Sequence, residues 1–150
     1  MSTDENLTND FRYDVFISYR QQEPDKNWVR EILVPRLEAA DLKICIDFRN
    51  FRLGSPLVTE MTRAVEESHY TLMVLSPSYL KSNFTEFENI LAEHLGLEKG
   101  ERRLIAIMRE PCKPNLRIRA RLWLDMVNDD DFHANIQRLI FELETPIRGK

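Results

Sequence analysis

Short apolar runs alternate with longer amphipathic segments along most of this chain. Continuous apolar runs are typical of the strands of a parallel sheet that is covered by helices on both faces. The third run is apolar enough for a central position in the sheet. The pattern therefore predicts an α/β fold with a five-stranded parallel sheet. The expected strands are residues 13–18, 42–47, 70–76, 103–108 and 121–124.

Apolar residues at helical spacing predict helices at 25–40, 57–67, 83–97 and 132–143. The expected inward-facing residues are Trp28, Ile32, Leu33 and Leu37 in the first helix and Ile136, Leu139, Ile140 and Leu143 in the last. Pro35 predicts a kink in the first helix, or a restart with Pro35 in a new first turn. Two prolines and many charges at 110–120 predict a loop with at most a short helix.

The length of 150 residues suits a single compact domain with a substantial core. Residues 1–10 lack apolar periodicity, so we expect a disordered tail there. We expect the domain to span residues 11–145, and residues 146–150 to be a linker or the end of a cut fragment.

Composition and charge exclude several classes of protein. Lys and Arg number 21 against 25 Asp and Glu, a net charge of −4 that does not recruit nucleic acid or anionic lipid. Cys45 and Cys112 are too far apart to suggest a disulfide framework, which fits a reducing compartment. No apolar stretch approaches the roughly 20 residues of a membrane helix. We expect a cytoplasmic protein that binds neither nucleic acid nor membrane.

Several familiar chemistries lack the residues that they need. The four glycines form neither a phosphate-binding loop nor a dinucleotide fingerprint, and the three histidines lack metal-ligand spacing. No Gly-x-Ser-x-Gly elbow provides a serine nucleophile. A phosphoacceptor receiver domain needs carboxylates at the ends of the first and third strands, where this chain has Ser18 and Ser76. No metal ion or resident cofactor is expected.

The ends of the first and third strands are the best candidate for a site. With the strand order 2-1-3-4-5, Ser18-Tyr19-Arg20 and Ser76-Pro77-Ser78 border one crevice, where open α/β sheets bind ligands. Arg20 supplies a cation suited to phosphate. Phe84 and Glu88 are four residues apart on one helix face, so a ring and a carboxylate lie together, a pair that suits a ribosyl base. Alternatively, Phe84 caps the core and Glu88 is solvated.

The segment 47–56 mixes arginine, aromatic residues, glycine and proline, which is typical of binding loops. Gly54 can supply a positive φ for the turn, and Pro56 can open the next helix. The alternative is that the loop only connects two elements and packs Phe48 or Leu53 onto the core.

Several separate motifs in this chain resemble those of the TIR (Toll/interleukin-1 receptor) domain family. They are Asp14-Val-Phe-Ile-Ser-Tyr-Arg20, Ile46-Asp47, Arg52-Leu-Gly54, Ala64-Val-Glu-Glu-Ser68, Val74-Leu-Ser76 and Trp123. The resemblance covers about residues 11–145 and implies a flavodoxin-like fold. It also implies that 47–56 is the BB loop of the family.

Enzymatic TIR domains cleave NAD+ and carry the pattern Ser-x-x-Tyr-x-x-Ser-x-Trp-x-x-x-Glu after the third strand. This chain has Ser76, Tyr79, Ser82, Phe84 and Glu88 at those positions, with Phe84 where Trp is frequent. The resemblance therefore implies an NAD+ nucleosidase with NAD+ as substrate and Glu88 as the catalytic residue. The residues that it suggests for the pocket are Tyr19, Arg20, Phe48, Leu53, Ser82 and Phe84, whereas Asp47 is structural or part of the site.

The resemblance also implies assembly with other TIR domains, in which the BB loop of one copy completes or opens the site of its neighbour. A fused sensor or oligomerising domain would bring the copies together. The chain lacks features of animal receptor adaptors, so the resemblance favours a bacterial protein of immune (antiphage) defence or cell-death signalling. The alternative is an adaptor that acts only through TIR–TIR contacts, without catalysis.

Overall fold

The computed structural model describes residues 11–82, 84–97 and 103–144, and the side chains of Phe84 and Thr85 are outside that description. The strands are β1 (Tyr13–Ser18), β2 (Ile44–Cys45), β3 (Ser68–Leu75), β4 (Leu104–Met108) and β5 (Trp123–Asp125). They form one parallel sheet in the order β2-β1-β3-β4-β5. The predicted sheet, strand order and flavodoxin-like fold are confirmed. The predicted tail at 1–10 and linker at 146–150 lie outside the described residues.

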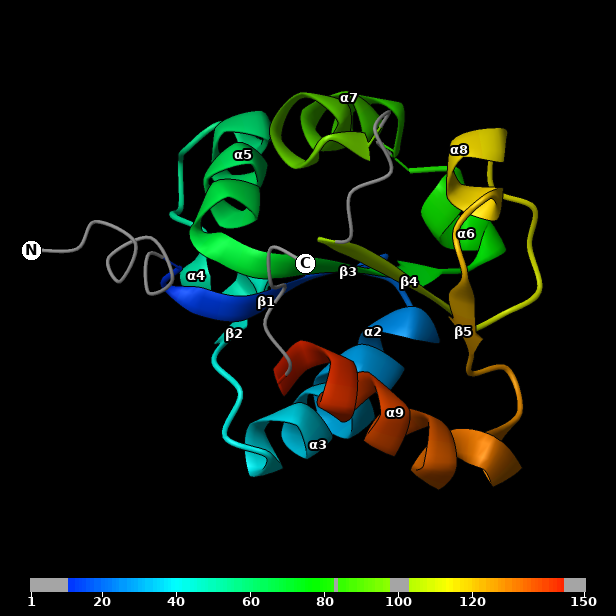
Figure 1. Ribbon diagram of the computed structural model, residues 1–150. Helices are drawn as coiled ribbons and strands as arrows, with labels where there is room; N and C mark the ends of the chain where they lie inside the picture. The colour runs from blue at the N-terminus through cyan, green and yellow to red at the C-terminus, as the bar shows by residue number, and fades with distance from the viewer. Residues whose placement is uncertain (1–10, 83, 98–102, 145–150) are drawn as a thin grey trace, which may run out of the picture.

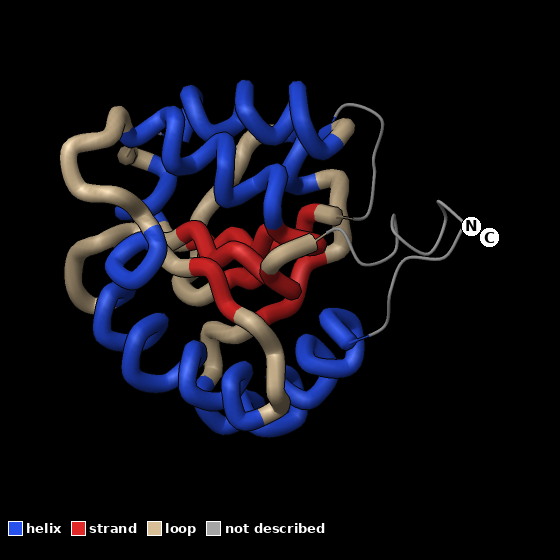
Figure 2. Tube along the Cα trace, turned by 90° about the vertical axis from the view of Figure 1, so that its left-hand side faces the viewer, coloured by secondary structure: helices blue, strands red, loops and turns tan. Residues whose placement is uncertain are grey.

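Helices cover both faces of the sheet, which gives three layers (Figures 1 and 2). One face carries α5 (Leu57–Glu67) and α7 (Phe84–Leu95), and the other carries α2 (Asp25–Asn27), α3 (Val34–Ala39) and α9 (Phe132–Glu144). Side chains of β1 alternate between the layers, because Val15 and Ile17 join the α3–α9 cluster and Phe16 joins the α5–α7 cluster. Burial on both faces explains the continuous apolar sequence of the strands.

The first helical segment departs from a regular α-helix. A π-helix, η1 (Trp28–Leu33), links α2 to α3, and Pro35 lies in the first turn of α3, so the predicted restart at Pro35 is confirmed. The wider π turn moves Ile32 outward, where it is 40% exposed, and buries Val29 and Val34 instead. The expectation that Ile32 faces the core is therefore wrong.

Two strands differ from their predicted bounds. At the sheet edge β2 is only two residues long, because Asp47 already begins the short helix α4 (Asp47–Asn50). The first part of the predicted 47–56 loop is thus helical. At the other edge, β5 begins two residues later than expected. Both edge strands have a partner strand on one side only, so their sequences determine the strand bounds less strictly than those of the central strands do.

Three short elements follow the strands. They are α6 (Pro77–Leu80), α8 (Leu116–Arg119) and the 3-10 turn η3 (Asp129–Asp131). The helix α8 lies inside the segment 110–120, where at most a short helix was expected. Among the described residues, none of the helices combines the length and the apolar character needed to cross a bilayer.

Candidate active site

A cavity of about 250 Å³ lies beside the carboxyl end of β1 and the α6 turn that follows β3. This is the switch point of the sheet, since the chain leaves β1 toward one face and β3 toward the other (Figure 1). The cavity is lined by Phe16, Ile17, Ser18, Tyr19, Arg20, Gln21, Asp47, Phe51, Leu57, Met61, Tyr79, Ser82 and Phe87. Three predicted site residues, Tyr19, Arg20 and Ser82, therefore meet at one cavity.

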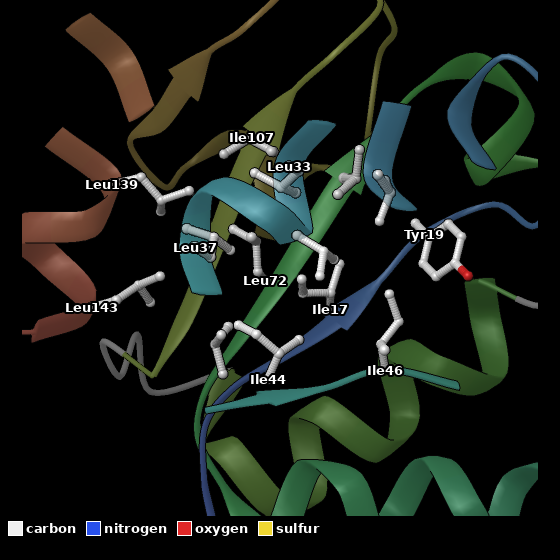
Figure 3. Close-up of a cluster of buried hydrophobic side chains, with 14 of the residues drawn as sticks. Ile17, Tyr19, Leu33, Leu37, Ile44, Ile46, Leu72, Ile107, Leu139 and Leu143 are labelled. Atoms are coloured by element: carbon white, nitrogen blue, oxygen red, sulfur yellow. The ribbon is translucent and has the colours of Figure 1, made fainter. Parts of the chain in front are cut away.

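Tyr19 forms one wall and is 9% exposed. It lies at the margin of the apolar cluster, and its hydroxyl points away from the aliphatic side chains (Figure 3). The hydroxyl donates to Oδ1 of Asp47 at 2.7 Å and accepts from Nε of Arg30 at 2.7 Å. Burial, followed by the hydrogen bond to Asp47, raises the pKa of the Tyr19 phenol. The phenol is a neutral, fixed group, and Asp47 is its structural partner.

Arg20 contributes the cationic group of the cavity. Its Nε is buried and has no hydrogen-bond partner within the described part of the chain. Arg20 as a whole is only partly buried, and it is one of the residues that line the cavity. The planar guanidinium suits the oxygens of a phosphate or carboxylate.

Hydrogen bonds fix Tyr79 at three points. Its backbone N–H donates to Oγ of Ser76 at 3.1 Å, and its carbonyl accepts from Oγ of Ser82 at 2.7 Å. Its hydroxyl lies 2.8 Å from Oγ of Ser18. Tyr79 is 3% exposed, so the strand end of β1 and the turn α6 are locked together through this ring.

Glu88 lies on α7, directly after the buried cavity residue Phe87. Its side chain is half-buried and accepts a hydrogen bond at Oε2 from the side-chain amide of Asn115. Burial is the main cause of the raised pKa of Tyr79, the bond to Ser18 lowers it, and the charge of Glu88 raises it further. Glu88 is thus not in the wall of the cavity and adjoins it through Phe87, and its hydrogen bond with Asn115 is exposed to solvent, so the alternative of a solvated carboxylate stays open.

Phe48 and Leu53 do not line this cavity in the single chain, so their place in a pocket shared with a second copy stays a prediction. Phe48 is 50% exposed because α4 turns its ring toward the guanidinium of Arg30, which lies 4.3 Å from the ring centroid. Leu53 is fully exposed beside Gly54, whose φ of 84° makes the turn. The alternative, that either residue packs onto the core, is wrong. Phe84 opens α7, but its side chain lies outside the described structure.

Several residues of the cavity wall were not predicted, chiefly Gln21, Phe51, Met61 and Phe87. Phe51 is the aromatic residue of the loop that packs inward, with its ring centroid 5.9 Å from that of Phe16. The available signal was the helical spacing of Met61 and Phe87 with their buried neighbours Val65 and Leu91, which puts both on inward faces.

The chemistry available here is the cation of Arg20, neutral hydroxyl groups, the carboxylate of Asp47, which accepts hydrogen bonds from Tyr19 and Gln21, and the carboxylate of Glu88 outside the wall. Within the described residues, no group of three or more His, Cys, Asp and Glu side chains is arranged to hold a metal ion. The cation and the hydroxyl groups suit an anionic, hydroxyl-bearing ligand, and a carboxylate can stabilise positive charge that forms close to it.

Comparisons with known proteins agree with this fold. Human Toll-like receptor 6 is 36% identical over 111 residues, which is 74% of this chain and 14% of the receptor. The TIR domain of the Toll-related receptor TRR-2 from Hydra magnipapillata has a TM-score of 0.75 at 26% identity, covering 89% of this chain and 99% of that one. A TIR-STING receptor from C. gigas has a TM-score of 0.69 at 21% identity, over 91% of this chain and 42% of that one, and so shows the fold alone.

These relatives are animal proteins, so they give no support to a bacterial origin, which stays a prediction. The chain spans about one seventh of the length of the curated receptors that it matches, 14% for human Toll-like receptor 6. The family model for the TIR domain matches residues 15–140. This chain therefore belongs to the TIR domain family.

Proposed function

We propose that this TIR domain cleaves the bond between nicotinamide and ribose in NAD+, with Glu88 as the catalytic residue. The observation that carries the proposal is the position of Glu88 on α7, partly buried and directly after Phe87, which lines the cavity. Tyr79 and Arg20 line the same cavity. A carboxylate is therefore fixed next to a cavity with an anion-binding group, as a phosphorylated ribose requires.

In this reaction the C–N glycosidic bond breaks, and its electron pair leaves with nicotinamide as a neutral molecule. No acid is needed to protonate that leaving group. Positive charge builds on the ribose, and the carboxylate of Glu88 stabilises the oxocarbenium-like transition state. Water then attacks the ribose carbon and loses a proton, which gives ADP-ribose. Attack by adenine or a ribose hydroxyl gives a cyclic isomer instead.

The wall residues have separate roles in this proposal. Arg20 lines the cavity and binds a phosphate oxygen through its guanidinium group. Ser82 and Tyr19 are held by their own hydrogen bonds, so they shape the cavity without having to reorganise when substrate binds. Phe84, at the first residue of α7, is our candidate for stacking on the base or ribose.

The size of the cavity supports a requirement for assembly. About 250 Å³ is below the roughly 300–1,000 Å³ of sites that enclose a drug-sized ligand, and a dinucleotide is at least that large. One copy therefore encloses only part of NAD+. A neighbouring copy that moves or covers the BB loop would enclose the rest.

Two apolar features at opposite edges of the sheet suit such an assembly. Leu53 is fully exposed in the loop after edge strand β2. At the other edge a groove of about 840 Å³, the β5 groove, lies between β5, α8 and α9. Its apolar lining residues are Leu97, Leu104, Ile105, Ala120, Leu122, Trp123, Leu124 and Leu139. Because the two features are on different edges, their contact would join copies head to tail.

The test is nicotinamide release from NAD+ by protein clustered on vesicles, for the wild type and Glu88→Ala. We expect release from the clustered wild type and a loss of about 100-fold in the variant. The matched control is Glu86→Gln, which alters an exposed glutamate on the same helix and should leave release unchanged. Equal rates for the wild type and Glu88→Ala would remove Glu88 from the reaction.

The second candidate is a TIR adaptor that works by assembly alone. It is favoured by the exposed Leu53 and the β5 groove, neither of which requires an active site. Clustered wild-type protein that assembles but releases no nicotinamide would support this candidate against the enzyme.

A further inference from the structure

A buried carboxylate on the far side of the sheet is joined to the site by hydrogen bonds. Asp25 begins α2, on the face opposite α7 (Figure 1), and is 1% exposed. Its Oδ2 accepts a hydrogen bond from the hydroxyl of Ser76, while Oδ1 has no partner in the described part of the chain. Burying a carboxylate is costly, so its retention in this place calls for an explanation.

Ser76 connects this carboxylate to the α6 turn. A serine hydroxyl has one proton, and here it is donated to Asp25, which directs the oxygen lone pairs toward the other side. The backbone N–H of Tyr79 donates to that oxygen at 3.1 Å, so Ser76 is the N-cap of α6. Asp25 therefore fixes the orientation of the capping group.

The helix α6 connects Ser76 to Tyr79, which lines the cavity. Tyr79 carries the hydroxyl that pairs with Ser18 at 2.8 Å, and its carbonyl accepts from Ser82 at 2.7 Å. Tyr79 also packs in one buried cluster with Phe87, the residue of α7 directly before Glu88. Every polar contact of Tyr79 named here depends on where α6 begins.

We infer that Asp25 is a positioning residue of the Glu88 site, acting through Ser76 and Tyr79. It accepts the Ser76 hydroxyl proton, holds the first turn of α6, and so keeps the Tyr79 ring between β1 and α7. The inference rests on the proposed function for its kinetic consequence, but its structural consequence can be measured without catalysis.

The first measurement is hydrogen exchange of the Tyr79 amide, by NMR on the whole chain well below its melting temperature. Asp25→Ala should accelerate this exchange by about tenfold, because the cap loses its orienting partner. The amide of Ile107 in β4 should not change. Asp25→Asn keeps a carbonyl acceptor for Ser76, so its exchange should remain near that of the wild type. If Asp25→Ala does not fold, Ser76→Ala is the replacement variant. It removes the oxygen that accepts from the Tyr79 N–H, so it should accelerate exchange of that amide as well.

The second measurement is nicotinamide release by the clustered chain. Asp25→Ala should lower kcat by about tenfold with KM for NAD+ unchanged. The substitution displaces the Tyr79 ring, which packs against α7, and leaves Arg20 in place. Asp25→Asn should restore kcat, and the double variant Asp25→Ala/Ser76→Ala should be no slower than either single one. The control is Thr71→Val on β3, which alters another fully buried polar side chain and should leave kcat unchanged.

Unchanged Tyr79 exchange in folded Asp25→Ala would overturn the inference, and so would faster exchange with an unchanged kcat. Equal loss of kcat in Asp25→Asn and Asp25→Ala would also overturn it, because only the alanine variant removes the acceptor. If the wild type releases no nicotinamide while Asp25→Ala accelerates exchange at Tyr79, the inferred linkage holds and the proposed activity fails.

Discussion

The cavity beside β1 and the β5 groove differ in size and in how their surfaces are built. The cavity measures about 250 Å³, and its polar groups are fixed by hydrogen bonds to Asp47, Ser76 and Ser18. The groove measures about 840 Å³ and is chiefly apolar, with arginines in its walls. Fixed polar groups in a small volume suit chemistry, whereas a large open apolar surface suits contact with another molecule. The larger hollow is therefore not the better candidate for an active site.

The β5 groove has a floor that belongs to the core and a rim that does not, and stability measurements should separate them. Leu139 is 1% exposed, so Leu139→Ala should lower the free energy of unfolding by about 2–5 kcal/mol through lost burial and a cavity. Leu122 is 93% exposed, and Leu122→Ala should change it by less than about 0.5 kcal/mol. Urea unfolding measures both. Similar losses would mean that the rim is also part of the core.

In the cavity, the largest effect outside Glu88 is expected at Arg20. Arg20→Gln removes the cation but keeps an amide, so KM for NAD+ should rise by about 10–100-fold with kcat little changed, which corresponds to one charge-assisted hydrogen bond. Steady-state kinetics of the clustered protein measure this. Arg12→Gln is the control, since Arg12 is exposed at the opposite end of β1. A fall in kcat alone would show that Arg20 acts on the reacting centre instead.

The sequence predicted most of the fold because the core strands are buried on both faces. The short apolar runs at β1, β3 and β4 are typical of strands buried on both faces of a parallel sheet. As expected, β3 lies at the centre of the sheet. The π turn of η1 was not predictable, because one extra residue per turn leaves an apolar pattern that also fits an α-helix. The expected inward position of Ile32 failed for that reason.

The site was predicted in part for a similar reason. Tyr19, Arg20 and Ser82 directly follow strand ends or the turn after β3, so topology alone brings them together. Loop side chains are not fixed by topology, and the turn at Gly54 puts Phe51 inside and Leu53 outside. The burial of Asp25 could not be predicted, because an acidic residue in the first turn of a helix is usually a surface residue.

The exposed loop provides a smaller test of the contact surface. Leu53→Asp introduces a charge where an apolar contact with the β5 groove of a second copy is proposed. We expect self-association, measured by sedimentation, to weaken by about tenfold, which corresponds to the burial of one leucine side chain. Ile32→Asp is the control, since Ile32 is an exposed apolar residue on η1, away from that loop. Equal weakening in both variants would indicate a general effect of charge.

The smallest expected effect concerns the carboxylate of Glu60, which holds the loop around Leu53 in place. Glu60 is buried at the start of α5, and its Oε1 accepts from the backbone N–H of Arg52 at 3.0 Å and from the guanidinium of Arg63. The Arg52 N–H is the largest cause of a pKa below the ordinary 4.5, followed by a hydrogen bond from Ser55. The carboxylate thus ties both sides of Leu53 to the helix.

Since the folded pKa of Glu60 is lowered, its contribution to stability is present above pH 4.5 and is lost as the pH falls through the folded value. The wild type should therefore lose more unfolding free energy than Glu60→Gln between neutral pH and a pH well below 4.5. Urea titrations over that range measure the difference, and Glu86→Gln, an exposed glutamate, should follow the wild type. Parallel curves for the wild type and Glu60→Gln would mean that the charge of Glu60 does not stabilise the loop. The exposed position of Leu53 would then depend on the Gly54 turn alone.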